Sequence, residues 1–182
     1  MLCFEESGYD EATTAVVAKR AGIAVGTLYG YFKNKRDILQ EVVDQTLGEV
    51  NELVIEQLAP AAWRGRDPRE IVRRLIDTVF HTQTIRPGTQ RVIFERYFKD
   101  DQFRAVVDAR QDRIREAIVG FLDAVEPGAG LRSIDHRAAA WAVHNAVEWN
   151  ASQAIIHFED DAAAVDRAAT EAADMIDRYL FE

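Results

Sequence analysis

TTAVVAKRAGIAVGTLYGYF, residues 13–32, reads as two short helices joined at a glycine. Thr13 or Thr14 suits the start of the first helix, because a threonine hydroxyl accepts a hydrogen bond from a free amide of the first turn. Gly22 suits its end, because glycine adopts the left-handed conformation of a helix C-terminus at no steric cost. In the second helix, Leu28 lies on the face expected to point to the core. The spacing predicts a helix-turn-helix, although periodicity alone fits the corner of an ordinary helical bundle equally well.

Charge is distributed unevenly along the chain. The formal net charge is −9, which by itself argues against nucleic acid binding, because phosphate binding relies on cationic side chains. Between Ala12 and Arg36, however, there is no Asp or Glu. The cations of this stretch are Lys19, Arg20, Lys33, Lys35 and Arg36. The sequence therefore predicts a small basic head on an acidic body.

The rest of the chain is expected to be helical. Apolar residues recur at helical spacing, and no stretch alternates with period two. Helices are predicted over about residues 35–58, from Pro68 to before Pro87, over 92–98, from about 101 to 125, and over about 135–158 and 161–180. The fold class is all-α, with a helix-turn-helix DNA-binding head over residues 1–45. Residues 46–182 are predicted to form a larger helical domain.

Several classes of protein are disfavoured. Cys3 is the only cysteine, so an intrachain disulfide or a cysteine-based metal site is excluded. No run approaches the roughly 20 uncharged residues that cross a bilayer, so we expect no membrane partner and a cytoplasmic location. A phosphate-binding glycine loop, an HExxH pair, a GxSxG turn and a Cys/His nucleophile are all missing from the sequence. We therefore predict no catalytic residue, no metal and no cofactor.

Residue identities add more than the spacing does. The informative positions are Thr13-Thr14, Ala18, Ala21-Gly22-Ile23, Gly26-Thr27-Leu28-Tyr29, Tyr31-Phe32 and Lys33-Asn34-Lys35. Over about residues 2–45 this combination resembles the N-terminal signature of TetR/AcrR-type transcriptional regulators. The resemblance implies a repressor that binds a palindromic double-stranded operator as a homodimer and is released by a small-molecule inducer. Members of that family begin with a fuller first helix, so the helix entered at Leu2 is expected to be incomplete.

The resemblance also implies roles for individual residues of the head. Contacts to the DNA backbone fall to Thr14, Thr27, Tyr29 and Lys35. Base reading falls to Val25, Gly26, Thr27, Gly30 and Tyr31. No Arg, Asn or Gln stands in the second set, so the bidentate pairs that identify guanine or adenine are missing from it. We expect this face to read thymine methyl groups and groove shape instead.

In the resembling family, the middle helices enclose the inducer pocket and the last two helices form the dimer interface. The candidate ligand-binding residues here are Phe80, Phe94, Tyr97, Phe98, Trp141, His144, Asn145, Glu148 and Trp149, with Trp63 as a further aromatic. Each aromatic has an ordinary core position as its alternative. The pair His144 and Glu148, four residues apart on a helix, has three alternatives: orienting a polar ligand group, pairing across the dimer, or facing solvent. The many alanines of the last two helices suit close helix approach, and we expect them to meet across a dimer, although a monomer core also tolerates them.

Two other functions stay open at this point. One is a DNA-binding architectural protein without an inducer, and the other is a helical enzyme that binds a small molecule. Binding to promoter DNA separates the repressor and the architectural protein from the enzyme. Loss of that binding on addition of a small molecule separates the repressor from the architectural protein.

Overall fold

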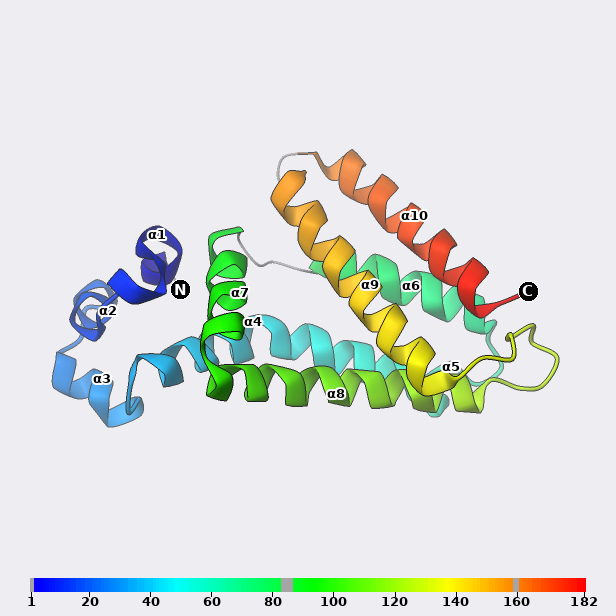
Figure 1. Cartoon of the computed structure of the whole chain (residues 1–182), viewed down its shortest axis with the longest axis horizontal. Coiled ribbons are helices and arrows are strands. Elements are labelled where there is room, and N and C mark those ends of the chain that lie inside the picture. The colour runs from blue at the N-terminus through cyan, green and yellow to red at the C-terminus, as the bar shows by residue number, and fades with distance from the viewer. Residues whose placement is uncertain (1, 83–86, 159–160) are drawn as a thin grey trace. The chain divides into compact units, whose positions relative to one another are not determined.

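The computed structural model describes residues 2–82, 87–158 and 161–182, and this part of the chain is built from helices (Figure 1). Its only β-type pairing is an isolated bridge between Leu131 and Phe181. The predicted all-α class is therefore confirmed. No helix among the described residues combines the length and the apolar character needed to cross a membrane.

The chain forms two compact units. The first, called the head unit below, comprises residues 1–48 and 85–108, and the second, the body unit, comprises residues 49–84 and 109–182. The sequence-based division at residue 45 left residues 85–108 out of the head. They pack there because Val92, Ile93 and Phe103 are buried in its apolar core.

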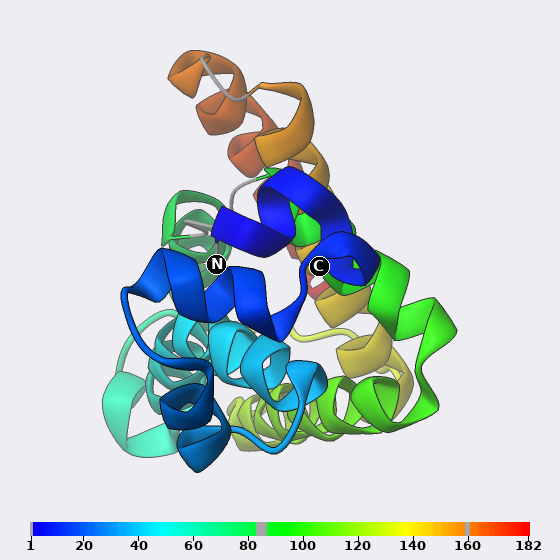
Figure 2. The ribbon, with the colours of Figure 1, turned by 90° about the vertical axis from the view of Figure 1, so that its left-hand side faces the viewer.

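The head unit contains α1 (Leu2–Glu11), α2 (Thr14–Ala21), α3 (Val25–Tyr31) and α7 (Pro87–Lys99). It also holds the first parts of α4 (Lys35–Leu58) and α8 (Asp101–Ala124). Figure 2 shows α1 to α3, coloured blue, on the side that faces the viewer. The buried core of this unit consists of Cys3, Phe4, Tyr9, Ala12, Ala18, Leu28, Ile38, Leu39, Val43, Val92, Ile93 and Phe103.

The helix-turn-helix forms through the two local signals expected from its sequence. Thr13 is the N-cap of α2, and its hydroxyl accepts a hydrogen bond from the Val16 amide at 3.3 Å. Gly22 ends α2 in the left-handed region, with φ 70°. The amide of Ile23 then donates to the Ala18 carbonyl at 3.0 Å, which satisfies an otherwise free carbonyl of the last turn. Ile23 itself does not fill the turn from inside, because it is 38% exposed.

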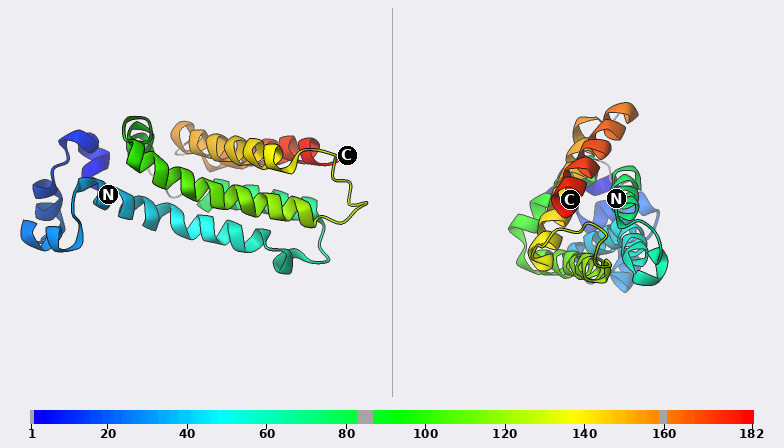
Figure 3. Two further views of the ribbon diagram at one scale, coloured as in Figure 1. Left: turned by 60° about the horizontal axis from the view of Figure 1, so that its bottom comes forward. Right: turned by 90° about the vertical axis from the view of Figure 1, so that its right-hand side faces the viewer.

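The body unit contains the rest of α4 and α8, with α5 (Pro60–Trp63), α6 (Pro68–Thr82), α9 (His136–His157) and α10 (Ala162–Leu180). In it α6, α9 and α10 lie against one another (Figures 1 and 3). Asp135 caps α9 by accepting hydrogen bonds from the amides of Arg137 and Ala138, and Asp161 caps α10 in the same way. The core includes Phe121 and Leu180, both almost fully buried.

The alanines of α9 and α10 belong largely to the core of one chain. The buried members are Ala139, Ala140, Ala151, Ala154, Ala164, Ala169, Ala172 and Ala173. Short side chains let neighbouring helices approach closely, and here they do so within the monomer. These eight alanines pack within one chain, and the expectation that alanines of the last two helices meet across a dimer stays a prediction.

His81 on α6 has a hydrogen-bond acceptor at each ring nitrogen, one on α6 itself and one on α10. Its Nδ1 lies 2.8 Å from the Asp77 carbonyl oxygen, and its Nε2 lies 2.8 Å from Asp166 Oδ1. Because neither partner has a proton to give, both ring nitrogens must donate for both bonds to form, which requires the imidazolium. The hydrogen bond to Asp166, followed by the one to the Asp77 backbone, accordingly raises the pKa of His81.

We predict that the coupling between His81 and Asp166 weakens as pH rises. A raised histidine pKa stabilises the folded state fully below the unfolded value of about 6.5, and this stability is lost as pH passes the folded pKa. The pair is exposed, so the effect is expected to stay below about 1 kcal/mol. A double-mutant cycle with His81→Ala and Asp166→Ala, measured by urea unfolding at pH 5.5 and 8.5, gives the coupling. Coupling that is equal or larger at pH 8.5 would contradict the assignment.

Candidate functional site

The outer face of α3 is open to solvent while its inner face is buried. Leu28 is 5% exposed, whereas Val25, Tyr29 and Tyr31 are 40%, 52% and 80% exposed. Gly26, Thr27 and Gly30 are exposed as well. The residues predicted to read bases therefore share an accessible surface, which is the geometric requirement for entering a major groove.

Gly26 and Gly30 leave this surface without side chains. A Cβ added at either position would meet no atom within 4 Å. Packing therefore does not require glycine there, and both lie in the regular helix α3. The absence of side chains at these two positions instead lets another molecule approach the α3 backbone closely.

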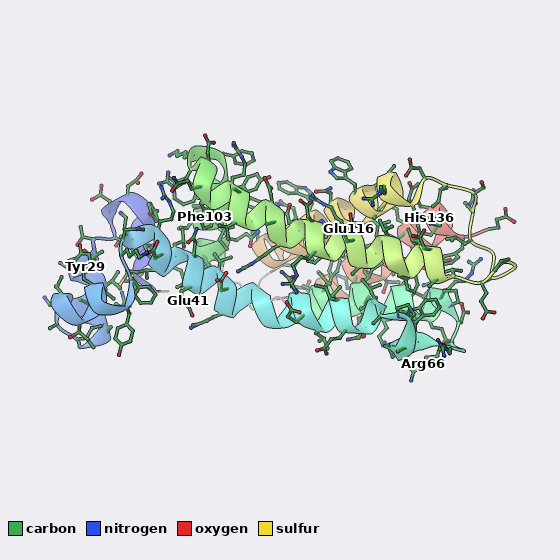
Figure 4. All side chains as sticks on the ribbon, turned by 90° about the horizontal axis from the view of Figure 1, so that it is seen from below. Tyr29, Glu41, Arg66, Phe103, Glu116 and His136 are labelled. Atoms are coloured by element: carbon green, nitrogen blue, oxygen red, sulfur yellow. The ribbon has the colours of Figure 1, made fainter. Side chains whose placement is uncertain are left out.

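Two of the predicted backbone contacts are joined to each other. The Thr14 hydroxyl on α2 and the Tyr29 hydroxyl on α3 lie 3.0 Å apart, and Tyr29 is labelled in Figure 4. Each hydroxyl has one proton and can also accept. Their mutual bond uses one proton, so the other is available for a phosphate oxygen. The bond also fixes α2 to α3 at the surface that carries both residues.

Lys35 has a partner that its sequence position did not indicate. Its Nζ donates to the carbonyl oxygens of Tyr9 at 2.6 Å and Asp10 at 3.1 Å, and it lies 4.4 Å from the centroid of the Tyr9 ring. The Arg96 guanidinium lies 4.5 Å from the same centroid. Lys35 thus satisfies carbonyls at the C-terminal end of α1 and ties that end to α4. Its contact with DNA stays a prediction.

The basic stretch of the head is partly neutralised inside the head unit. Arg20 forms a two-pronged ion pair with Glu6. Arg36 donates to Asp100 at 2.7 Å and also to Gln102. Lys19 and Lys33 remain exposed. Partners contributed by other helices cannot be read from residues 12–36 alone, so the sequence overstates the free positive charge there.

In the body unit, four polar side chains from α8 and α9 form what we call the polar cluster, Gln111, Arg115, His144 and Glu148. Gln111 donates to Glu148 Oε2 at 3.3 Å, and Arg115 donates to Gln111 Oε1 at 3.0 Å. His144 Nε2 lies 3.7 Å from Glu148 Oε2, which is beyond hydrogen-bonding distance. Of these residues, the sequence identified only the pair on α9. Gln111 and Arg115 also stand four residues apart on one helix, and this spacing was the signal available for finding them.

Burial dominates the electrostatics of the polar cluster. His144 is 7% exposed, and burial, assisted by the positive charge of Arg115, lowers its pKa to about 4. His144 is therefore neutral at pH 7. Burial also raises the pKa of Glu148, opposed by Arg115 and by the hydrogen bond from Gln111. Desolvation thus favours the uncharged form of both residues on α9.

The other ligand candidates are not gathered around this cluster. Phe80 and Trp63 are core residues of the body unit, and the Trp63 indole donates to the Leu58 carbonyl at 3.1 Å. Trp141 and Trp149 lie on the surface, 60% and 56% exposed. Asn145 donates to the Trp141 carbonyl one turn back along α9, at 2.7 Å.

The remaining three candidates, Phe94, Tyr97 and Phe98, belong to α7 in the head unit. Phe98 is 74% exposed, and the Tyr97 hydroxyl donates to Asp108 at 2.7 Å. Of the predicted set, only His144 and Glu148 belong to the polar cluster, while Tyr97 and Phe98 contact each other edge to face on α7, with ring centroids 5.3 Å apart. The described residues contain no group of three or more His, Cys, Asp or Glu side chains that could hold a metal ion.

Two family models match the chain. Residues 1–42 match the model described as bacterial regulatory proteins, tetR family. Residues 67–180 match the model described as the tetracyclin repressor-like C-terminal domain. The second match covers more than half of the chain, and together the two leave only the segment from 43 to 66 and the last two residues unmatched.

Individual relatives agree with the family models. The HTH-type transcriptional regulator BetI of Stenotrophomonas maltophilia is 35% identical over 88 residues, which are 48% of this chain and 43% of BetI. The match thus spans less than half the length of that relative. Among solved structures, FadR of Bacillus subtilis in complex with stearoyl-CoA has a TM-score of 0.77 at 20% identity, covering 96% of this chain and 92% of FadR. SmeT, the repressor of a Stenotrophomonas maltophilia multidrug efflux pump, has a TM-score of 0.73 at 21% identity, covering 100% and 86%. The likeness to these two structures shows the fold.

We predict that Lys35→Met destabilises the head unit by about 1–3 kcal/mol, because two carbonyls of α1 lose their donor and the Tyr9 ring loses its cation. Faster amide hydrogen exchange in α1, together with a lower urea midpoint, would measure the effect. Lys33→Met is the matched control, since Lys33 is an exposed lysine two residues away. Equal stability of the two variants would contradict the positioning role of Lys35.

Proposed function

Because the chain belongs to the TetR family of bacterial regulatory proteins, we propose that it is a transcriptional repressor that binds a palindromic operator as a homodimer. A small-molecule inducer releases it from the DNA. The observation that carries the proposal is the exposed face of α3, with its two bare glycines and the Thr14–Tyr29 hydroxyl pair beside it. Every relative named above is described as a regulator, and catalysis forms no part of the proposal.

DNA binding follows from the chemistry of the head unit. Val25, Thr27 and Tyr31 read thymine methyl groups and groove shape, while Gly26 and Gly30 allow close approach to the bases. Thr14, Thr27 and Tyr29 hold phosphates through hydroxyl groups, and Lys35 adds positive charge at the start of α4. Contacts of this kind position the head without identifying a particular base, so much of the specificity comes from the shape of the DNA.

The dimer forms through α9 and α10. These helices leave large apolar side chains exposed, namely Trp141, Trp149, Ile156, Met175 and Tyr179. On α9 the spacings of eight and seven residues keep Trp141, Trp149 and Ile156 on one side of the helix. Exposed apolar residues grouped in this way indicate an interaction surface. A two-fold axis through it presents two heads to the two halves of a palindrome.

Release follows from helices that serve both units. Gln111 and Arg115 of the polar cluster stand on α8, and the same helix carries Phe103, which is 1% exposed in the core of the head unit. A ligand that binds the polar cluster better in one conformation shifts the population toward it. Movement of α8 and α4 then changes the separation of the two α3 helices. Half-sites one DNA turn apart require a separation of about 34–36 Å, so a change of a few ångströms weakens both contacts.

Solved relatives support the inducer step in general terms. FadR of Bacillus subtilis is described in complex with stearoyl-CoA, and SmeT in complex with triclosan. Both ligands are bound small molecules with a large apolar part. The inducer of this protein is proposed to bind in the body unit, with His144 and Glu148 as contacts.

We predict that Gly30→Arg leaves the fold intact but alters operator binding. A Cβ at Gly30 meets nothing within 4 Å, so thermal unfolding is expected to be unchanged. A guanidinium on the groove face brings the bidentate guanine contact that the natural face lacks, worth about 1–3 kcal/mol between bases. Titration of randomised operators, read by sequencing the bound fraction, measures the change in preference. Gly120→Arg on α8 in the body unit, equally free of neighbours, is the control. Unchanged preference in Gly30→Arg would show that α3 does not enter the groove.

We also predict that Trp149→Glu lowers the association constant of the dimer by at least about tenfold, because a carboxylate replaces an indole in a surface that becomes buried. Sedimentation velocity over a concentration series measures the constant. Phe98→Glu is the control, since Phe98 is an aromatic residue 74% exposed in the head unit. If Trp149→Glu sediments like the unmodified protein, α9 is not the interface.

A further inference from the structure

Two polar atoms of the polar cluster are buried without a hydrogen-bond partner among the described residues, His144 Nδ1 and Arg115 Nε. The other ring nitrogen of His144, Nε2, lies 3.7 Å from Glu148 Oε2, which is too far for a hydrogen bond. Buried polar groups in native proteins are almost always hydrogen-bonded, so an exception calls for an explanation. Nothing in the fold requires a histidine here, since its neighbours along the buried face of α9, Ala140, Val143 and Val147, are apolar.

The packing of α8 against α9 places Arg115 and His144 at facing positions. Gln111 on α8 contacts Glu148 on α9, and Asp123 contacts His136 at 2.6 Å. The two helices therefore run antiparallel at this contact. One turn forward from Gln111 is Arg115, and one turn back from Glu148 is His144. Arg115 consequently stands opposite His144, which agrees with the effect of its charge on the pKa of that histidine.

The free hydrogen-bonding capacity of the pair is limited. Both terminal nitrogens of Arg115 already donate, to Asp112 at 2.9 Å and to Gln111 at 3.0 Å, and Nε is the guanidinium nitrogen that has no partner. A carboxylate is normally held by two parallel N–H groups of one guanidinium, and the two terminal nitrogens of this guanidinium already serve other acceptors. On His144, Nε2 faces the carboxyl group of Glu148, an arrangement that favours a proton on Nε2 and a lone pair on Nδ1. The pair thus offers one donor and one acceptor.

We propose that the polar cluster binds the hydroxyl group of an uncharged alcohol or phenol on an apolar body. The hydroxyl oxygen accepts the hydrogen bond from Arg115 Nε, and the hydroxyl proton is donated to His144 Nδ1. This inference rests on the proposed function, because it names the chemical class of the inducer.

The charges around the cluster favour a neutral ligand. His144 is uncharged at pH 7, its pKa being lowered to about 4, and the charge of Arg115 is paired with Asp112. A carboxylate would lie beside the carboxyl group of Glu148, and both terminal nitrogens of Arg115 already serve other acceptors. An ammonium group would meet Arg115. A hydroxyl group satisfies both orphan atoms and introduces no net charge into a region of low polarity.

The test uses phenol as the probe, with benzoate, benzylammonium and toluene as matched aromatic compounds. The full chain contains four histidines, so the ring nitrogen signals of the ¹⁵N-labelled protein are few and His144→Phe assigns the one of interest. We expect phenol to shift the His144 signal saturably and to bind at least tenfold more tightly than each of the other three compounds. Benzoate or benzylammonium binding as tightly as phenol would overturn the proposal. So would the lack of a saturable shift with phenol, which would leave only a bound solvent molecule at these atoms.

Variants separate a ligand contact from a structural one. His144→Phe removes the unpaired nitrogens, so its thermal midpoint is expected to stay equal or to rise while phenol affinity falls at least tenfold. His157→Phe, an exposed histidine on the same helix, is expected to keep phenol binding. A lower midpoint in His144→Phe with unchanged phenol affinity would contradict the proposal. Operator titration tests the phenol inference and the proposed function separately. If the protein binds DNA but does not respond to phenol, only the phenol inference is refuted. If it responds to phenol but binds no promoter DNA, the proposed function is refuted.

Discussion

The head unit depends on a packing constraint. Helices α1 to α3 are too short to bury a core of their own, because a chain of about 30 residues encloses too little apolar surface to be stable alone. They complete it with side chains of α4, α7 and α8, including Leu39 and Phe103, which are each 1% exposed. Helices that continue into the body unit therefore form part of the surface against which α3 is held. The position of α3 in the head unit therefore depends on residues that lie far from it in the sequence.

Polar contacts refine the position that packing sets. Lys35 and Arg96 both lie against the Tyr9 ring, and Lys35 also holds the last carbonyls of α1. The Thr14–Tyr29 bond then joins α2 to α3 at the exposed face. These contacts leave the outer residues of α3 unoccupied, as a reading surface requires.

In the body unit, small and large apolar residues that are interspersed along α9 and α10 lie in different places. Eight alanines on α9 and α10 are buried and let the helices of one chain approach closely, whereas Trp141, Trp149 and Met175 remain on the surface. His144 is buried too, and its Nδ1 has no hydrogen-bond partner among the described residues. Burying such a group costs about 1–3 kcal/mol when no partner is present. Ligand binding therefore explains the presence of His144 better than a contribution to the stability of the fold does.

The helical class, the bounds of α4 and the glycine turn of the helix-turn-helix follow from the sequence alone, which also narrows the N-cap of α2 to Thr13 or Thr14. These features depend on neighbours within one or two turns, so local spacing suffices to predict them. The packing of the helices was needed to show that Lys35 holds α1, that Arg20 is paired with Glu6, that α7 belongs to the head unit, and that Arg115 stands opposite His144. Each of these pairings joins different helices, and which helix faces a given side chain is settled by the burial of the whole apolar core rather than by any local pattern.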